Sequence, residues 1–336
     1  MSGIVGHTTY GVLALREAWK RKLRTAPLAT RHYSSFLAGA YLGSDIQTMP
    51  SVVCTATGAE AGYGGLPYAG CPGDDSRPWK LAFEKAEYLP RQIHEMFYGR
   101  AHLIFGWTKQ EQSQRIPWDR LPEYFAACLQ DVFDVYGPSE RTLAYLLDWT
   151  VHVVSDSLIK SQQPGLTLKL LDGTYTPRNR PVQDLFAFHE IGLKELRLDW
   201  AALFADIAAT PVEPAQAHYM RVAEPRGQLA KHFPAHWRPE QKPLLLAVLQ
   251  ENRRWARRHF VDEIAEMRLV RNSKGELDAA PSVVQKTGLH LAEMMEAARE
   301  AKLREQIGVI ANECASLIEA IEKRLPRLQS LSTVPF

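Results

Sequence analysis

The sequence predicts an all-α protein, and two observations carry that prediction. Apolar residues recur three and four positions apart, the spacing of one helix face, over well over half of the chain. Nowhere do strand and helix patterns alternate, as they would in a protein built on a parallel sheet. With 336 residues, the chain can bury a large hydrophobic core. We therefore expect one multi-helix bundle over residues 1–336, with a long Gly-rich loop inserted in it.

The first two expected helices cover residues 8–22 and 33–42. The first ends in basic side chains, which suit the negative C-terminal end of a helix dipole, and a proline separates it from the second. The second contains Ala38, Gly39 and Ala40, small residues that allow another helix to approach closely. This spacing predicts a tight helix crossing near the end of the second helix.

Residues 51–78 are rich in glycine and form the expected loop insertion. A loop of this length in a compact domain is usually functional or mobile, so it is either a flap beside a site or a surface insertion. Cys54 and Cys71 bracket several of its glycines. They would form a disulfide in an oxidising compartment, or remain two unrelated thiols.

Helical patterns resume after this loop and continue nearly to the end of the chain. Residues 166–181 alone have strand or turn character, and a Pro-rich connection over 210–242 either joins parts of one bundle or separates two domains. The expected helices cover residues 79–87, 90–105, 121–136, 141–165, 182–208, 243–271 and 282–324.

The helix over 141–165 is the most informative element. Between residues 143 and 159 it is apolar on almost every face, which predicts a helix buried all round. His152 and Asp156, four residues apart, leave the same face of that helix. A buried carboxylate is costly unless its charge is compensated, and a cation bound by imidazole and carboxylate, such as zinc, would compensate it. The alternative is a His–Asp hydrogen bond inside the core.

Charge, hydropathy and motifs limit the classes of protein that the sequence could belong to. A formal net charge of +2 gives no electrostatic argument for or against nucleic acid as a partner. No stretch is long and apolar enough to span a membrane, and the N-terminus lacks the basic start of a signal peptide. We expect a soluble chain, secreted or periplasmic if a leader has been removed and cytoplasmic otherwise. Nucleophile elbow, P-loop and dinucleotide-binding motifs are absent from the sequence.

Four short segments resemble, in order along the chain, the zinc-dependent phospholipases C and the single-strand-specific zinc nucleases. The segments are Ser-Gly-Ile-Val-Gly-His at 2–7, Gly-Ser-Asp-Ile at 43–46, the helix with His152 and Asp156, and Thr-Gly-Leu-His-Leu-Ala at 287–292. These enzymes share an all-helical fold with three zinc ions. The resemblance therefore implies that fold and a zinc centre that acts on phosphate esters.

The resemblance also implies which residues would hold two neighbouring metals. The first would be bound by Asp45, His152, Asp156 and a further histidine. We favour His102 for that position because an apolar run follows it, and His94 is the alternative. The second metal would be bound by two further residues, with Asp156 as a bridge. One of them is His7. The other is Ser2, which would bind through its carbonyl and its amine; the amine could bind only if Met1 is removed.

The third metal of the resemblance is poorly matched. Its first histidine falls on Gln162, and its His-x-x-x-Asp/Glu pair would use His189, four residues before Leu193. Glu190 or Glu195 could replace the missing carboxylate. We therefore expect one or two zinc ions rather than three.

Asp148 lies one helical turn before His152. It is either a carboxylate that orients the histidines or a solvent-side or capping residue, and we favour the second interpretation.

The function implied is that of a metal-dependent phosphoesterase, with Asp45 and Asp156 at the catalytic centre. It would hydrolyse phosphodiester or phosphomonoester bonds through a metal-bound hydroxide, and its substrate would be a phospholipid or a single-stranded nucleic acid. The alternative is a non-catalytic helical protein, binding or structural, that keeps the fold and a degenerate metal site. Gln162 and Leu193 favour this alternative, whereas His7, Asp45, His152 and Asp156 favour the enzyme.

Overall fold

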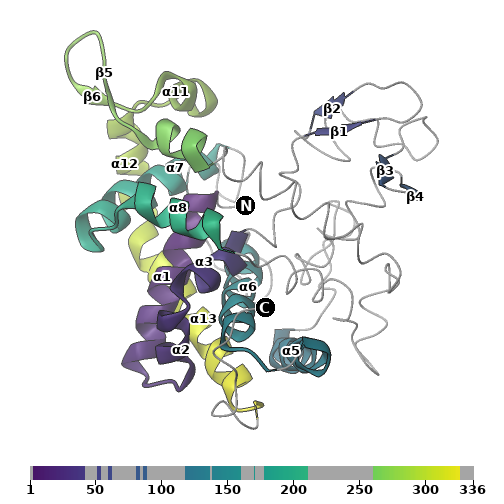
Figure 1. The fold of residues 1–336 in the computed structure, drawn as a ribbon. Coiled ribbons are helices and arrows are strands. Elements are labelled where there is room, and N and C mark those ends of the chain that lie inside the picture. The colour runs from purple at the N-terminus through teal and green to yellow at the C-terminus, as the bar shows by residue number, and fades with distance from the viewer. Residues whose placement is uncertain are drawn as a thin grey trace.

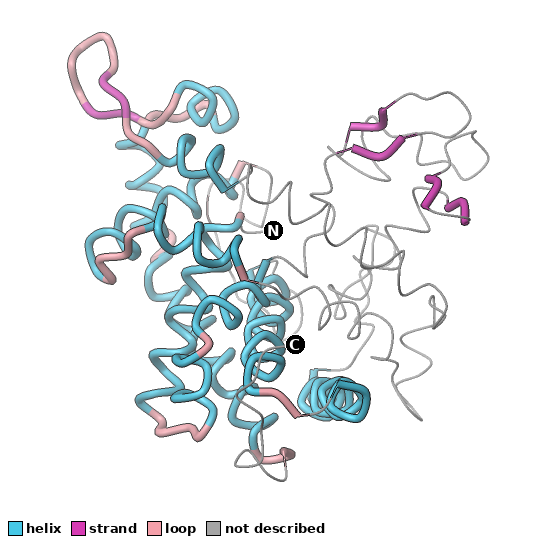
Figure 2. The backbone as a smooth tube through the Cα atoms, viewed as in Figure 1, coloured by secondary structure: helices cyan, strands magenta, loops and turns pink. Residues whose placement is uncertain are grey.

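In the computed structural model, the described part of the chain is mostly helical, which confirms the all-α class (Figures 1 and 2). Near the N-terminus lie α1 (Ile4–Lys20), α2 (Thr25–Arg31) and α3 (Tyr33–Tyr41). The structure describes residues 3–41, 51–53, 60–62, 81–83, 86–88, 118–136, 138–159, 170, 178–210 and 260–325.

The central part of the bundle contains α5 (Leu121–Tyr136), preceded by the short helix η3 (Trp118–Arg120), and α6 (Glu140–Ile159). After α6 come α7 (Asn179–Phe186), the π-helical segment η4 (Ala187–Glu195) and α8 (Trp200–Ala209). Residues 260–267 are helical, and α11 (Pro281–Thr287), α12 (Leu291–Glu300) and α13 (Leu303–Glu322) follow them.

Helix α6 lies at the centre of the packing, as the sequence predicted. All its residues except Arg141 are buried, because α1, α2, α3, α5 and α13 all pack against it. The crossing with α3 is especially close at Gly39, where a Cβ would lie 2.1 Å from the Tyr145 carbonyl oxygen. The small residues of α3 therefore allow the close packing expected of them. Among the described residues, no helix combines the length and the apolar character needed to cross a membrane.

Strands are confined to three short antiparallel hairpins in the described part of the chain. The pairs are β1 (Ser51–Val53) with β2 (Glu60–Gly62), β3 (Leu81–Phe83) with β4 (Ala86–Tyr88), and β5 (Val270–Arg271) with β6 (Leu277–Asp278). The helix expected over 79–87 is therefore wrong, since the hairpin of β3 and β4 occupies that stretch. Likewise, the helix expected over 243–271 ends before the hairpin of β5 and β6.

Two long helices expected near the C-terminal half are divided into shorter ones. The stretch 182–208 breaks between η4 and α8, where the Asp199 side chain accepts a hydrogen bond from the Ala202 amide and starts a new helix. The stretch 282–324 breaks twice. Gly288 ends α11 with a left-handed φ of 73°, and Lys302 precedes α13 with a left-handed φ of 50°.

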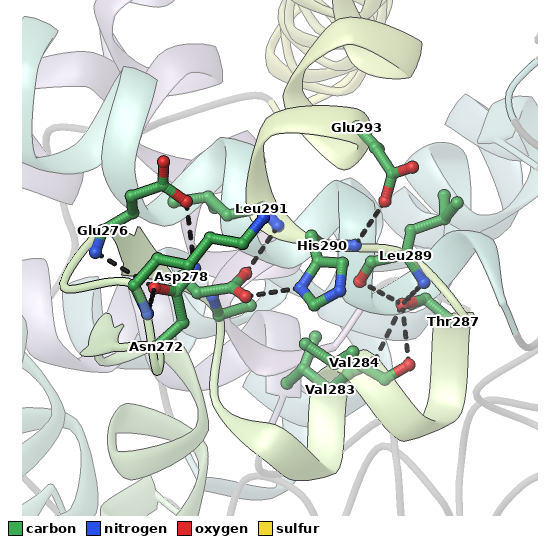
Figure 3. Close-up of polar contacts among 12 residues, drawn as sticks. Asn272, Glu276, Asp278, Val283, Val284, Thr287, Leu289, His290, Leu291 and Glu293 are labelled. Atoms are coloured by element: carbon green, nitrogen blue, oxygen red, sulfur yellow. Dashed lines mark hydrogen bonds and ion pairs between the residues drawn. The ribbon is translucent and has the colours of Figure 1, made fainter.

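The junction between β6 and α12 is held by a polar cluster (Figure 3). Asp278 accepts hydrogen bonds from the Leu291 and Ala279 amides, each at 2.8 Å, and from His290 Nδ1 at 2.5 Å. The His290 amide in turn donates to Glu293 at 2.8 Å, which caps the start of α12. These bonds fix the hairpin of β5 and β6 to the first turn of α12.

Several sequence predictions concern residues outside the described ranges. They include most of the Gly-rich loop 51–78 and its Cys54–Cys71 pair, the helix over 90–105, most of 166–181 and the connection 210–242. Cys128 and Cys314 are buried and do not form a disulfide.

Candidate metal centre

Three side chains predicted from the sequence meet in the interior. His7 comes from α1, and His152 and Asp156 come from α6; all three are fully buried. One ligand atom from each residue lies within 4.8 Å of the other two. The i, i+4 spacing on α6 accounts for two of them, and the packing of α1 against α6 brings the third. This group could hold a metal ion.

A backbone carbonyl determines which ring nitrogen of His152 carries the proton. Its Nδ1 lies 2.6 Å from the carbonyl oxygen of Ala40. A carbonyl only accepts hydrogen bonds, so Nδ1 is the nitrogen that carries the proton in the neutral ring. The last carbonyls of a helix lack partners within it, and α3 ends at Tyr41, which leaves the Ala40 carbonyl available. Nε2 is therefore the unprotonated nitrogen of the neutral His152 ring, the one that can act as a metal ligand.

Ser155 acts on His7 in a similar way. The Ser155 hydroxyl donates to the His152 carbonyl oxygen at 3.1 Å. With its single proton in that bond, the Ser155 oxygen is an acceptor for the Nδ1–H tautomer of His7, whose Nδ1 lies 3.2 Å away. His7 Nε2 is then unprotonated and lies 3.4 Å from Asp156 Oδ1. In this tautomer two buried acceptors face each other, an arrangement that a cation between them stabilises.

The two imidazole rings are also stacked. Their centroids lie 4.2 Å apart and their planes differ by 24°. Stacking holds both rings in fixed positions beside Asp156. A site whose ligands are already oriented loses less conformational freedom when a metal binds.

Asp148 is neither a solvent-side nor a capping residue, so the interpretation favoured from the sequence is wrong. Its side chain is fully buried in the middle of α6, against Gly11 of α1, where a Cβ would lie 2.6 Å from Asp148 Oδ1. Burial raises the pKa of Asp148 well above its usual range, and the backbone N–H of Ala40 opposes that rise. The bonds that orient the two histidines come instead from the Ala40 carbonyl and Ser155.

A second polar cluster lies at the N-terminal end of α1, and sequence reasoning missed it. Asp184 of α7 and Glu263 of the 260–267 helix are both buried. Arg180 approaches both of them, with Nε 3.6 Å from Asp184 Oδ2 and Nη2 3.8 Å from Glu263 Oε1. Burial raises the pKa of Asp184; the guanidinium of Arg180, His7 and two backbone N–H groups oppose that rise. Burial also raises the pKa of Glu263, to about 7.

The resemblance suggested His189, with Glu190 or Glu195 as the carboxylate, for a further metal in η4, and the structure gives each of these three residues another partner. His189 Nε2 donates to the Met267 carbonyl oxygen at 2.7 Å. Glu190 pairs with Lys194 at 2.6 Å, and Glu195 pairs with Arg304 at 2.8 Å. None of the three belongs to the buried group of His7, His152 and Asp156.

The remaining predicted ligands lie outside the described part of the chain. They are Ser2, Asp45, His94, His102 and Gln162. Tyr41, the last residue of α3, precedes Asp45 by four positions, and Ser2 immediately precedes Gly3. In the sequence, Ser2 therefore lies next to the start of the helix that carries His7, and Asp45 follows the helix whose Ala40 carbonyl accepts from His152.

Comparisons of the chain with protein-family models, curated proteins and solved structures give no match.

Proposed function

We propose that the protein is a zinc-dependent phosphoesterase whose centre contains His7, His152 and Asp156. The observation that carries this proposal is the position of two possible metal-ligand atoms, His7 Nε2 and Asp156 Oδ1, which lie 3.4 Å apart in the interior. With zinc–ligand bonds of about 2.0–2.1 Å, two ligands of a tetrahedral site lie about 3.3–3.4 Å apart. The 3.4 Å between His7 Nε2 and Asp156 Oδ1 therefore matches the separation of two ligands of a zinc ion.

The kinds of ligand also fit zinc. Two imidazole nitrogens and one carboxylate oxygen form a set found at catalytic zinc sites, where a fourth position is left for water or substrate. We assign Asp45 and either His102 or His94 as further ligands, following the resemblance. One or two ions then fit the residues better than three, because Gln162 and Leu193 replace the family's ligands to the third.

Zinc in such a site lowers the pKa of a bound water and polarises a phosphoryl oxygen. The protein holds the metal ligands in position. Ala40 and Ser155 orient the two imidazoles, and Asp156 supplies the negative charge that retains a divalent cation. The substrate class proposed is a phosphate ester, either a phospholipid or a single-stranded nucleic acid.

Hydrolysis of bis(4-nitrophenyl) phosphate tests the proposal. The zinc-loaded protein should release nitrophenolate, lose that activity on dialysis against a chelator, and regain it on addition of zinc. His7→Ala should remove the activity, whereas Glu190→Gln, a substitution in the exposed pair with Lys194, should leave it unchanged. If the protein binds zinc but hydrolyses none of three substrates (this ester, a phospholipid and single-stranded DNA), the proposed phosphoesterase activity would be contradicted.

One observation favours a second candidate function. The three ligands have no exposed surface, and closed metal sites in proteins are usually structural. In that case the chain would be a non-catalytic helical protein stabilised by one ion. A large fall in the thermal midpoint on chelation, without turnover at any zinc concentration, would distinguish this function from the first.

A further inference from the structure

Helix α1 begins without a cap of its own. The residue before its first turn is Gly3, which has no side chain to accept a hydrogen bond, and the first turn contains no acidic residue. The first amides of a helix have no partners within it, and a buried unpaired N–H is costly. Because the start of α1 is buried, a group from elsewhere in the chain has to satisfy these amides.

Asp184 of α7 supplies the missing acceptor. Its two oxygens lie 3.0 and 3.1 Å from the Gly3 amide, and Oδ1 lies 3.1 Å from the Gly6 amide. The Gly3 carbonyl then accepts from the His7 amide at 3.1 Å. One carboxyl group thus binds both ends of the turn from which His7 projects.

The same turn has no space for a larger residue at its start. A Cβ on Gly3 would lie 2.3 Å from Asp184 Oδ2 and 2.6 Å from Glu263 Oε1. Glycine at this position is therefore what lets the carboxyl group reach the backbone. Arg180 holds the other side of Asp184, with Nε at 3.6 Å.

We infer that Asp184 is a positioning residue for the proposed zinc centre. It fixes the first turn of α1 and thereby the direction in which His7 Nε2 faces Asp156, and it adds negative charge behind His7. This role rests on the proposed metal site. It also extends that site to α7, far in sequence from the ligands on α1 and α6.

The chain contains a matched control for this inference. Glu322 of α13 caps α2 in the same way, accepting from the Thr25 amide at 2.8 Å and the Thr25 hydroxyl at 2.9 Å. From His7 to the end of α1 at Lys20 is about 20 Å along the helix axis, and Thr25 lies beyond that end. Loss of this cap removes a comparable contact without touching the metal ligands.

The experiment compares the zinc affinity of wild type, Asp184→Asn and Glu322→Gln by competition with a chromophoric chelator. Loss of a residue that orients a metal ligand typically weakens binding about 10- to 100-fold. We expect a loss of that size in Asp184→Asn, together with a shifted visible spectrum of the cobalt-substituted protein. Glu322→Gln should lower the thermal midpoint and leave both the affinity and the spectrum unchanged.

The outcomes separate this inference from the proposed function. A wild-type protein that binds no zinc would overturn both. Wild-type affinity in Asp184→Asn, or equal loss in the two variants, would overturn the positioning role and leave the metal site intact. Should Asp184→Asn fail to fold, Gly3→Ala provides the second variant, because its Cβ would displace Asp184. Its control is Gly308→Ala, whose Cβ makes only an ordinary contact at 3.5 Å.

Discussion

The Nδ1 atom of His152 donates to the carbonyl oxygen of Ala40 at 2.6 Å, which joins the centre of α6 to the last turn of α3. The bond determines which ring nitrogen of His152 carries the proton in the neutral ring and which one can act as a metal ligand. It depends on how closely the two helices cross, and Gly39, adjacent to Ala40, permits that close approach. The helix packing and the chemistry of the site therefore depend on the same residue.

Gly39→Ala should destabilise the protein strongly. The new Cβ would lie 2.1 Å from the Tyr145 carbonyl oxygen and 2.9 Å from the Trp149 amide nitrogen, so the backbones of α3 and α6 would have to separate. We expect a loss of about 3 kcal/mol in the free energy of unfolding, measured in urea, and weaker zinc binding.

Gly308→Ala in α13 is the matched control, and it should gain about 0.5–1 kcal/mol as a helix-interior substitution. If Gly39→Ala were as stable as wild type, the close crossing of α3 and α6 would be wrong.

The sequence predicted the parts of this protein that depend on local spacing. Four-residue spacing placed His152 and Asp156 on one face, and the apolar run over 143–159 predicted a helix buried all round. The small residues at 38–40 predicted that another helix packs closely against this one. Each of these features involves residues that are close to one another in the sequence, so the sequence alone can indicate it.

What the sequence could not predict depends on contacts between distant segments. Asp184 caps α1 across 181 positions of the chain, and no local pattern signals such a partner. Burial of Asp148 in the middle of α6 likewise follows from the approach of Gly11 on another helix. The hairpin of β3 and β4 replaced an expected helix because a short apolar run fits either structure.

Glu263 should make stability fall as pH rises towards neutrality. Burial raises its pKa to about 7, with Asp184 and Glu266 adding to the rise and Arg180 opposing it. An unfolded glutamate titrates near 4.3, so the folded state binds the proton more tightly. Stability from this group is complete below about pH 4 and is lost as the pH rises through about 7.

Glu263→Gln should remove that dependence, which amounts to about 3 kcal/mol between pH 4 and 8 for a shift of this size. Urea unfolding of wild type and variant across this range provides the measurement. Parallel pH curves for the two proteins would contradict the assignment.

The pair of Asp278 and His290 should contribute most at mildly acidic pH. The Leu291 amide, with His290, lowers the pKa of Asp278, and Asp278 raises the pKa of His290. The contribution of Asp278 is present above its unfolded pKa and is lost as the pH falls through its lowered folded value. That of His290 is present below about 6.5 and is lost as the pH rises through its raised value.

The window of greatest stabilisation therefore lies between about pH 4 and 6.5. A proton NMR titration of His290 should give a pKa above the usual histidine value of about 6.5, and Asp278→Asn should lower it. An unchanged His290 titration in the variant would show that the two groups do not interact.

His189→Ala should retain wild-type zinc affinity. Its Nε2 donates to the Met267 carbonyl and lies outside the buried group, so the substitution removes a link between η4 and the 260–267 helix rather than a ligand. We expect a loss of about 1 kcal/mol in the free energy of unfolding, typical of one hydrogen bond. A large fall in zinc affinity would instead assign His189 to the metal site, as the resemblance implied.

The most direct test of the central claim is the zinc content of wild type and Asp156→Asn. Both proteins would be incubated with zinc, passed through a desalting column and analysed by mass spectrometry of the metal. We predict about one or two zinc ions per wild-type chain, and loss of zinc together with a lower thermal midpoint in Asp156→Asn, because the variant lacks the carboxylate charge. Less than one zinc per wild-type chain, or equal zinc in the two proteins, would contradict the claim that His7, His152 and Asp156 form a metal centre.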